Sequence, residues 1–173
     1  MAEQKPRQYK KKDEKKVAVP DTDALGHQQP QNIPMEQAVL GALLIEQDAY
    51  SIVSEILRPE CFYDHRHQII YRTIRDLNIR QNPVDILTVA EALEASGELE
   101  EIGGPYYITT LSAKVSSSAH IEYHARVIAQ KHLARELITF TSKVQTEAFD
   151  PGNDVDELMQ YAEGRLFELS QQN

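Results

Sequence analysis

The apolar positions between His120 and Phe149 predict one long helix with two differently directed faces. The stretch contains no proline or glycine, so at 1.5 Å per residue it forms a helix about 45 Å long. At 100° per residue, the first half of the pattern lies within about 40° of Ile121, and the second half lies about 100° to 180° away. The two sets are Ile121, Ala125, Ile128 and His132, and then Leu133, Leu137, Phe140, Val144 and Ala148. Two faces need two packing partners, so the pattern favours assembly over catalysis.

A second long helix is predicted from Asp154 to about Gln171, after the turn Asp150-Pro151-Gly152-Asn153. A four-residue connection between two long helices favours an antiparallel hairpin. One apolar stripe runs along this second helix, made of Val155, Leu158, Met159, Ala162, Leu166 and Leu169. The candidate interaction residues of the hairpin, its dimer face, are Leu133, Leu137, Phe140, Val144, Leu158, Met159 and Leu166.

Shorter amphipathic segments precede the hairpin and contain no alternating strand pattern, so the fold class is all-α. We expect a small multi-helix globule over residues 33–118, followed by a long antiparallel helical hairpin over residues 119–173. Residues 1–32 are polar, rich in Lys and Gln, and predict a disordered arm. The expected helices of the globule begin at Ile33, run from the N-cap Asp48 to Arg58, span Asp64–Arg80, follow the N-cap Asp85 as far as Gly97, and span Tyr106–Val115.

Composition places the chain among soluble globular proteins: 41% of its residues are hydrophobic, 26% are charged, and none is Trp. No apolar run approaches the roughly 20 residues that cross a bilayer. Cys61 is the only cysteine, which excludes an internal disulfide and favours a reducing, cytoplasmic location.

The net charge of -9 is unevenly distributed. Residues 1–30 have a net charge of +2, whereas residues 31–173 have eleven basic and twenty-two acidic side chains. The body of the chain should therefore repel phosphate backbones. The lysines at 10–12 and 15–16 either form a solvated arm or touch nucleic acid or an acidic partner weakly.

No motif predicts a catalytic, cofactor-binding or metal-binding residue. His120 and His124 have the helical spacing of a zinc clamp, but Glu122 lies about 200° round the helix from the first histidine. A metal site that combines these two with His65 and His67 would require residues far apart in the sequence to meet by coincidence. We therefore interpret all four as surface or boundary histidines. Gly103-Gly104 matches neither a phosphate loop nor a dinucleotide fingerprint.

Six blocks in order over residues 32–140 resemble the N-terminal domain of bacterial replicative DNA helicases of the DnaB family. The blocks are Ile33-Pro34-x-Glu36-x-Ala38-Val39-Leu40-Gly41-Ala42-Leu43-Leu44, Leu57-x-Pro59-Glu60-x-Phe62-Tyr63, His67-Gln68-x-Ile70-Tyr71, Pro83-Val84-Asp85 with Thr88 and Leu93, Ile102-Gly103-Gly104-x-Tyr106-Tyr107-Ile108 and Ser118-Ala119-His120-Ile121-Glu122-Tyr123-His124-Ala125-Arg126-Val127-Ile128. The chain departs from the family at His120, where asparagine is usual, and at His124, where an aromatic residue is frequent.

The resemblance implies a homo-oligomer, with hairpins pairing subunits into dimers and three pairs forming a collar above six ATPase domains. It also implies that primase docks on the collar, and it admits a helicase loader as a further partner. ATP, Mg and DNA would bind the ATPase domain of the parent protein, which this fragment lacks. An alternative is a stand-alone helical adaptor or loader that binds a helicase or primase. A small metal hydrolase using the histidines is the third hypothesis.

Overall fold

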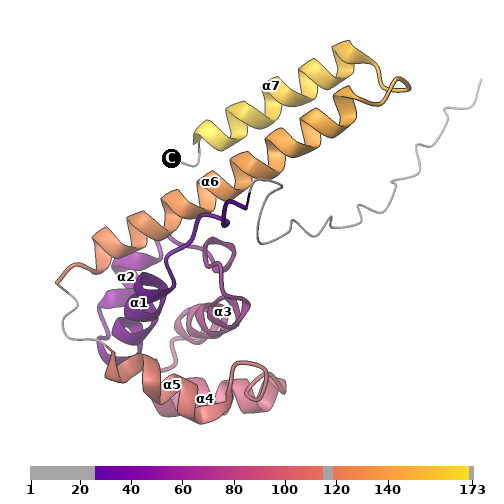
Figure 1. Cartoon of the computed structure of the whole chain (residues 1–173). Coiled ribbons are helices and arrows are strands. Elements are labelled where there is room, and N and C mark those ends of the chain that lie inside the picture. The colour runs from indigo at the N-terminus through magenta and orange to yellow at the C-terminus, as the bar shows by residue number, and fades with distance from the viewer. Residues whose placement is uncertain (1–25, 115–118, 172–173) are drawn as a thin grey trace, which may run out of the picture.

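The computed structural model describes residues 26–114 and 119–171. Within them it contains seven α-helices and one 3-10 helix but no β-strand, which confirms the all-α prediction (Figure 1). The lysine-rich part of the predicted arm, the joint at 116–118 and the last two residues lie outside the described residues. The helices are α1 Ile33–Ile45, α2 Ala49–Val53, η1 Pro59–Cys61, α3 His65–Ile79, α4 Ile86–Ser96, α5 Gly104–Ala113, α6 Ile121–Ala148 and α7 Val155–Gln171.

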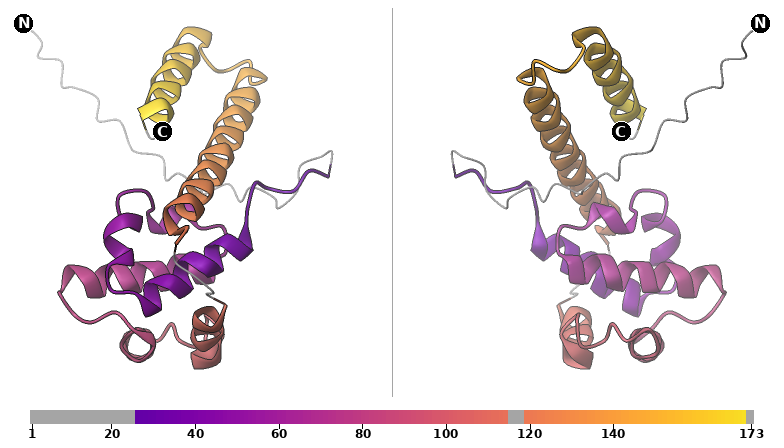
Figure 2. Two further views of the ribbon diagram at one scale, coloured as in Figure 1. Left: turned by 90° about the vertical axis from the view of Figure 1, so that its left-hand side faces the viewer. Right: turned by 90° about the vertical axis from the view of Figure 1, so that its right-hand side faces the viewer.

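Helix α1 lies at the centre of the globule and packs against α2, α3, α5 and α6. Its sequence is apolar on nearly all sides, which is the pattern of a helix surrounded by others. Val39 and Leu40 are fully buried, and Gly41 lies among the buried residues of the same helix. Helices α1 to α5 therefore form a globule around one core, and α6 crosses it before continuing outward (Figures 1 and 2).

Helices α6 and α7 form the predicted antiparallel hairpin, and it projects away from the globule (Figure 2). Helix α6 extends from Ile121 to Ala148, which confirms the uninterrupted helix expected from the lack of breakers. None of the helices in residues 26–114 and 119–171 is long and apolar enough to cross a membrane.

Local capping chemistry confirms several predicted boundaries. The Asp64 carboxylate accepts the backbone N–H of Arg66 at the start of α3. The Asp85 carboxylate accepts the N–H groups of Leu87 and Thr88 at the start of α4. Helix α4 ends at Gly97, whose φ of 76° is a left-handed conformation that favours glycine.

Two boundaries were wrong. Helix α2 ends at Val53, although we expected it to continue to Arg58, and the Asp48 side chain makes no capping hydrogen bond. The Val53 carbonyl accepts both Ile56 N–H and Leu57 N–H, which closes the helix in a turn. Pro59 then holds Arg58 extended, at φ -123° and ψ 163°.

Helix α5 begins at Gly104, two residues before the predicted Tyr106. The turn before α5 is therefore two residues shorter than the predicted start at Tyr106 implies. Gly103 and Gly104 both have positive φ, 98° and 72°, and Pro105 occupies the first turn of the helix, where its missing N–H costs nothing.

Substituting Asp85 with Ala is expected to lower the free energy of unfolding by about 1 kcal/mol at pH 7, because two backbone N–H groups lose their acceptor. The hydrogen bond from Thr88 N–H holds the pKa of Asp85 below its usual range. The contribution of the carboxylate is therefore complete above the unfolded pKa of about 3.9 and is lost as the pH falls through the folded pKa. Urea denaturation at pH 7 and at pH 3 measures both effects.

The control for this cap is Asp85→Asn, because asparagine caps helices about as well as aspartate but does not titrate. It should keep the stability at pH 7 and lose the part of the pH dependence that Asp85 causes. Equal stability of the Ala variant and the natural chain at pH 7 would show that the cap contributes nothing.

Candidate interaction surface

The two halves of α6 contact different partners. Ile121, Ala125 and Ile128 are buried in the globule core, where α6 packs against α1, α2 and η1. The second half packs against α7, and near its beginning Arg135 also contacts Pro30, Cys61 and Tyr63. The change of direction in the apolar pattern thus coincides with the point at which α6 leaves the globule (Figure 1).

Mixed polar and aromatic contacts join α6 to α7. Glu136 accepts a hydrogen bond from Arg165 at 2.7 Å, and the rings of Phe140 and Tyr161 are 6.3 Å apart. The Lys143 ammonium lies 4.6 Å from the centre of the Tyr161 ring. Hydrogen bonding to Glu168, and the nearby charge of Glu136, raise the pKa of Arg165. These contacts mark the side of each helix that faces the other.

Much of the apolar stripe is turned away from these contacts. On α6, Leu137 lies about 90° round the helix from the side that meets α7. On α7, Met159 and Leu166 lie roughly 120° to 140° from the side that meets α6, in the same rotational sense. Because the helices are antiparallel, rotations in the same sense bring their side chains to the same side of the hairpin.

This apolar side of the hairpin is exposed in the single chain. The exposed fractions of the side chains are 44% for Leu137, 55% for Met159 and 54% for Leu166. Single exposed apolar residues are common on protein surfaces, but a contiguous set of them is not. We define the apolar side by six residues that share this orientation: Leu133, Leu137, Val144, Val155, Met159 and Leu166.

The seven residues of the predicted dimer face therefore separate into two groups. Phe140 and Leu158 are half-buried and lie toward the partner helix of the hairpin. Leu133 and Val144 are also half-buried but are turned toward the apolar side, with the exposed Leu137, Met159 and Leu166. Val155, 71% exposed, belongs to the apolar side but was not included in the prediction.

Arg135 ties α6 to the rest of the molecule. Its guanidinium donates to the carbonyls of Pro30 and Cys61, each at 2.7 Å, and lies 5.5 Å from the centre of the Tyr63 ring. Burial lowers the pKa of Arg135, which nevertheless remains charged at neutral pH. One side chain thus fixes the hairpin against both η1 and the segment that leads into α1.

A buried polar network, which the sequence analysis missed, joins α1, α3 and α5. His67 is fully buried; its Nδ1 lies 2.6 Å from Glu36 Oε2, and its Nε2 lies 2.7 Å from the Tyr107 hydroxyl. The Glu36 carboxylate also accepts the backbone N–H groups of Tyr63 and Asp64. Our interpretation of His67 as a surface or boundary residue was therefore wrong, because its partners lie 31 and 40 residues away in sequence.

The other histidines form no metal site in the part of the chain that the structure describes. No group of three or more His, Cys, Asp or Glu side chains there could hold a metal ion. His65 pairs with Glu101 at 3.3 Å, and the exposed His120 precedes the first turn of α6.

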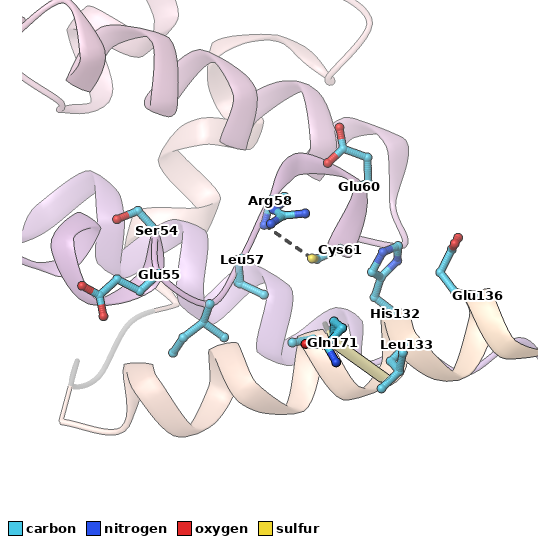
Figure 3. Close-up of a pocket in the computed structure, with 12 residues that line it drawn as sticks. Ser54, Glu55, Leu57, Arg58, Glu60, Cys61, His132, Leu133, Glu136 and Gln171 are labelled. Carbon is cyan, nitrogen blue, oxygen red and sulfur yellow. Dashed lines mark hydrogen bonds between the residues drawn. The ribbon is translucent and has the colours of Figure 1, made fainter. Parts of the chain in front are cut away.

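A cleft of about 620 Å³ separates η1 from the hairpin (Figure 3). Residues 54–61 form one wall, α6 forms the other, and the end of α7 closes one side at Gln171. Three carboxylates, from Glu55, Glu60 and Glu136, and the single guanidinium of Arg58 line it. The cleft is therefore acidic.

The comparisons with known proteins agree with this architecture. Residues 28–130, more than half of the chain, match the family described as "DnaB-like helicase N terminal domain". The chain is 46% identical over 145 residues to the replicative DNA helicase DnaB of Rhodothermus marinus, covering 84% of this chain and 15% of that protein. It is 37% identical over 142 residues to the replicative DNA helicase DnaC of Bacillus subtilis, covering 82% of this chain and 31% of that protein. The chain thus spans less than a third of the length of these relatives.

Two solved structures share the fold. The N-terminal domain of DnaB helicase from Mycobacterium tuberculosis superposes with a TM-score of 0.77 at 38% identity, covering 82% of this chain and 99% of that one. A DnaB-like replicative helicase, solved to show its interactions with primase, superposes with a TM-score of 0.65 at 28% identity, covering 80% of this chain and 31% of that one. The family match, the sequence identities and the shared globule-and-hairpin fold lead to one conclusion: the chain belongs to the DnaB-like helicase N-terminal domain family.

Proposed function

We propose that this chain is the N-terminal part of a replicative DNA helicase, in which it pairs subunits through the hairpin and docks primase. The observation that carries the proposal is the apolar side of the hairpin, which is exposed although its residues belong to two long, regular helices. Covering this side would remove the exposed apolar surface of Leu137, Met159 and Leu166 from water, which favours association.

Pairing would bring the apolar sides of two hairpins together around a two-fold axis. In such an interface the same patch of both copies is buried, so one set of residues serves both subunits. Acidic side chains such as Asp156 and Glu163 are exposed on α7 and would form part of a polar rim. Dimers of this kind, assembled in threes, would give the hexamer expected of the parent protein.

The acidic character of the body supports protein partners over direct DNA contact. Residues 31–173 carry twice as many acidic as basic side chains, so phosphate backbones are repelled from most of the surface. Primase is the proposed partner because a relative of the same fold was solved to show its interactions with primase. A helicase loader is a further proposed partner, and no residue of the chain is assigned to either contact.

The proposed division of the chain follows from these roles. Residues 1–32 form the arm, residues 33–118 the globule, and residues 119–173 the dimerisation hairpin. ATP hydrolysis with Mg, DNA binding and unwinding of the duplex would belong to an ATPase domain elsewhere in the parent protein. The role of this fragment is then assembly and docking.

The test of pairing is the mass of the chain in solution. Multi-angle light scattering at tens of micromolar should give about twice 19.7 kDa or a larger multiple of it. A monomeric mass throughout this concentration range, with a folded circular dichroism spectrum, would overturn the pairing role.

A further inference from the structure

The proposed function assigns no role to the lysine-rich arm or to the acidic cleft. We propose that residues 15–20, Lys15-Lys16-Val17-Ala18-Val19-Pro20, dock in the cleft between η1 and α6 of the same chain. The segment and the cleft are complementary in charge, and both contain apolar side chains.

The cleft is lined by both apolar and acidic side chains. Ile56, Ala129 and Leu133 contribute apolar surface from its two walls. Glu55 and Glu60 are exposed, and neither forms an ion pair within residues 26–114 and 119–171. These carboxylates are thus available to a cation from outside the described residues.

Arg58 is the only Lys or Arg among the cleft residues. Burial lowers the pKa of His132, which favours the neutral form of its ring at pH 7. Glu136 is already paired with Arg165 but adds to the negative potential of the same wall. A segment with two ammonium groups therefore improves the charge balance of the cleft.

The sequence of residues 15–20 suits this lining. In an extended chain, alternate side chains point to the same side, so Val17 and Val19 would together meet the apolar residues of the cleft. Lys15 and Lys16 precede them directly and have long, flexible stems that reach the acidic side chains. Residues 15–20 contain no acidic side chain.

The arm enters the folded part of the molecule beside the cleft. The Arg135 guanidinium donates to both the Pro30 carbonyl and the Cys61 carbonyl, and Cys61 lines the cleft. The structure describes the chain from Gly26 onward, and the seven steps from Val19 to Gly26 span up to about 23 Å when extended. This reach exceeds the 10–12 Å diameter of a helix such as α6, so the segment can pass round it to the cleft.

A spin label on the arm tests the proposal. Cys61 is the only cysteine, so a Cys61→Ser, Ala18→Cys double variant of the whole chain accepts one label, on the side of the segment opposite to the valines. We expect the label to reduce the amide NMR signals of Glu60, Leu133 and Gln171 at least fivefold at low salt, and less in 0.5 M NaCl. The signal of Leu87, on α4 and outside the cleft, should be unaffected.

The matched charge variants are Lys15→Glu with Lys16→Glu, and Lys10→Glu with Lys11→Glu as the control. Only the first pair should restore the cleft signals, because both pairs change the net charge equally but only the first lies in the docking segment. No signal loss in the cleft, or equal restoration by both pairs, would overturn the proposal.

Mixing separates docking within one chain from docking between chains. An isotopically labelled chain without a spin label is mixed with spin-labelled chain that carries no isotope. Docking within one chain leaves the observed cleft signals intact. Loss of these signals in the mixture would overturn docking within the chain and assign the cleft to the arm of a second copy.

Discussion

Replacing Glu36 with Ala is expected to lower the free energy of unfolding by about 3–5 kcal/mol, the usual cost of removing one partner from a buried ion pair or its hydrogen-bonded equivalent. Glu36 is 1% exposed, and its carboxylate accepts from two backbone N–H groups as well as contacting His67. Truncation leaves all three partners buried without an acceptor. Since domains of this size have a total stability of about 5–15 kcal/mol, the variant should be close to unfolding.

Urea denaturation followed by circular dichroism measures this loss. The controls are Glu36→Gln, which keeps the volume and one acceptor oxygen, and Tyr107→Phe, which removes only the hydroxyl 2.7 Å from His67 Nε2. Both should cost less than Glu36→Ala, and Tyr107→Phe about 1 kcal/mol. A Glu36→Ala variant within 1 kcal/mol of the natural chain would mean that the network does not stabilise the globule.

The Leu137→Asp variant is expected to weaken pairing of the proposed dimer by at least about 100-fold, which corresponds to about 2.7 kcal/mol. A two-fold interface contains the substitution twice, so the two carboxylates share this loss of binding free energy. Each contributes about half of it, because each loses its hydrating water when the interface forms. Leu137 is 44% exposed in the single chain, so helicity should be unchanged. Analytical ultracentrifugation over a dilution series gives the dissociation constant.

Ile138→Asp is the matched control for this prediction. Ile138 neighbours Leu137 and is 36% exposed, but it lies about 190° round α6 from the side that meets α7, on the far side of the hairpin. Equal dissociation constants for the Leu137 and Ile138 variants would remove the apolar side from the interface. Phe140→Asp is a poorer test, because Phe140 contacts Tyr161 and its loss would open the hairpin itself.

Most helices and the family could be predicted from the sequence because their signals are local. Asp85 caps the helix that it was expected to cap, α3 begins directly after Asp64, where a helix was expected to begin, and the absence of breakers between Ile121 and Ala148 gives one helix. The predicted end of α2 at Arg58 was wrong because this boundary does not depend on local signals alone. Pro59 disfavours a helical Arg58, and the turn at Val53 that accommodates this restriction depends on packing as well as on residue type.

The candidate dimer face was predicted only as a set of apolar residues, because a helical pattern gives only the angle of each side chain around the axis of its own helix. The sequence does not say at which angle a neighbouring helix lies. Helix α7 meets α6 near Glu136 and Phe140, and this placement decides that Phe140 is half-buried whereas Leu137 is exposed. The orientation of a neighbour is a property of the packed molecule.

The sequence by itself determined the all-α class, the long helix, the hairpin and the resemblance to the family, since periodicity, capping and turn chemistry act over a few residues. Tertiary structure alone decided that His67 is buried between Glu36 and Tyr107, and that Arg135 joins Pro30 to Cys61. Such contacts link residues 31 to 105 positions apart. A polar side chain can be buried only where partners from other elements replace its lost water, and the folded chain decides where those partners meet.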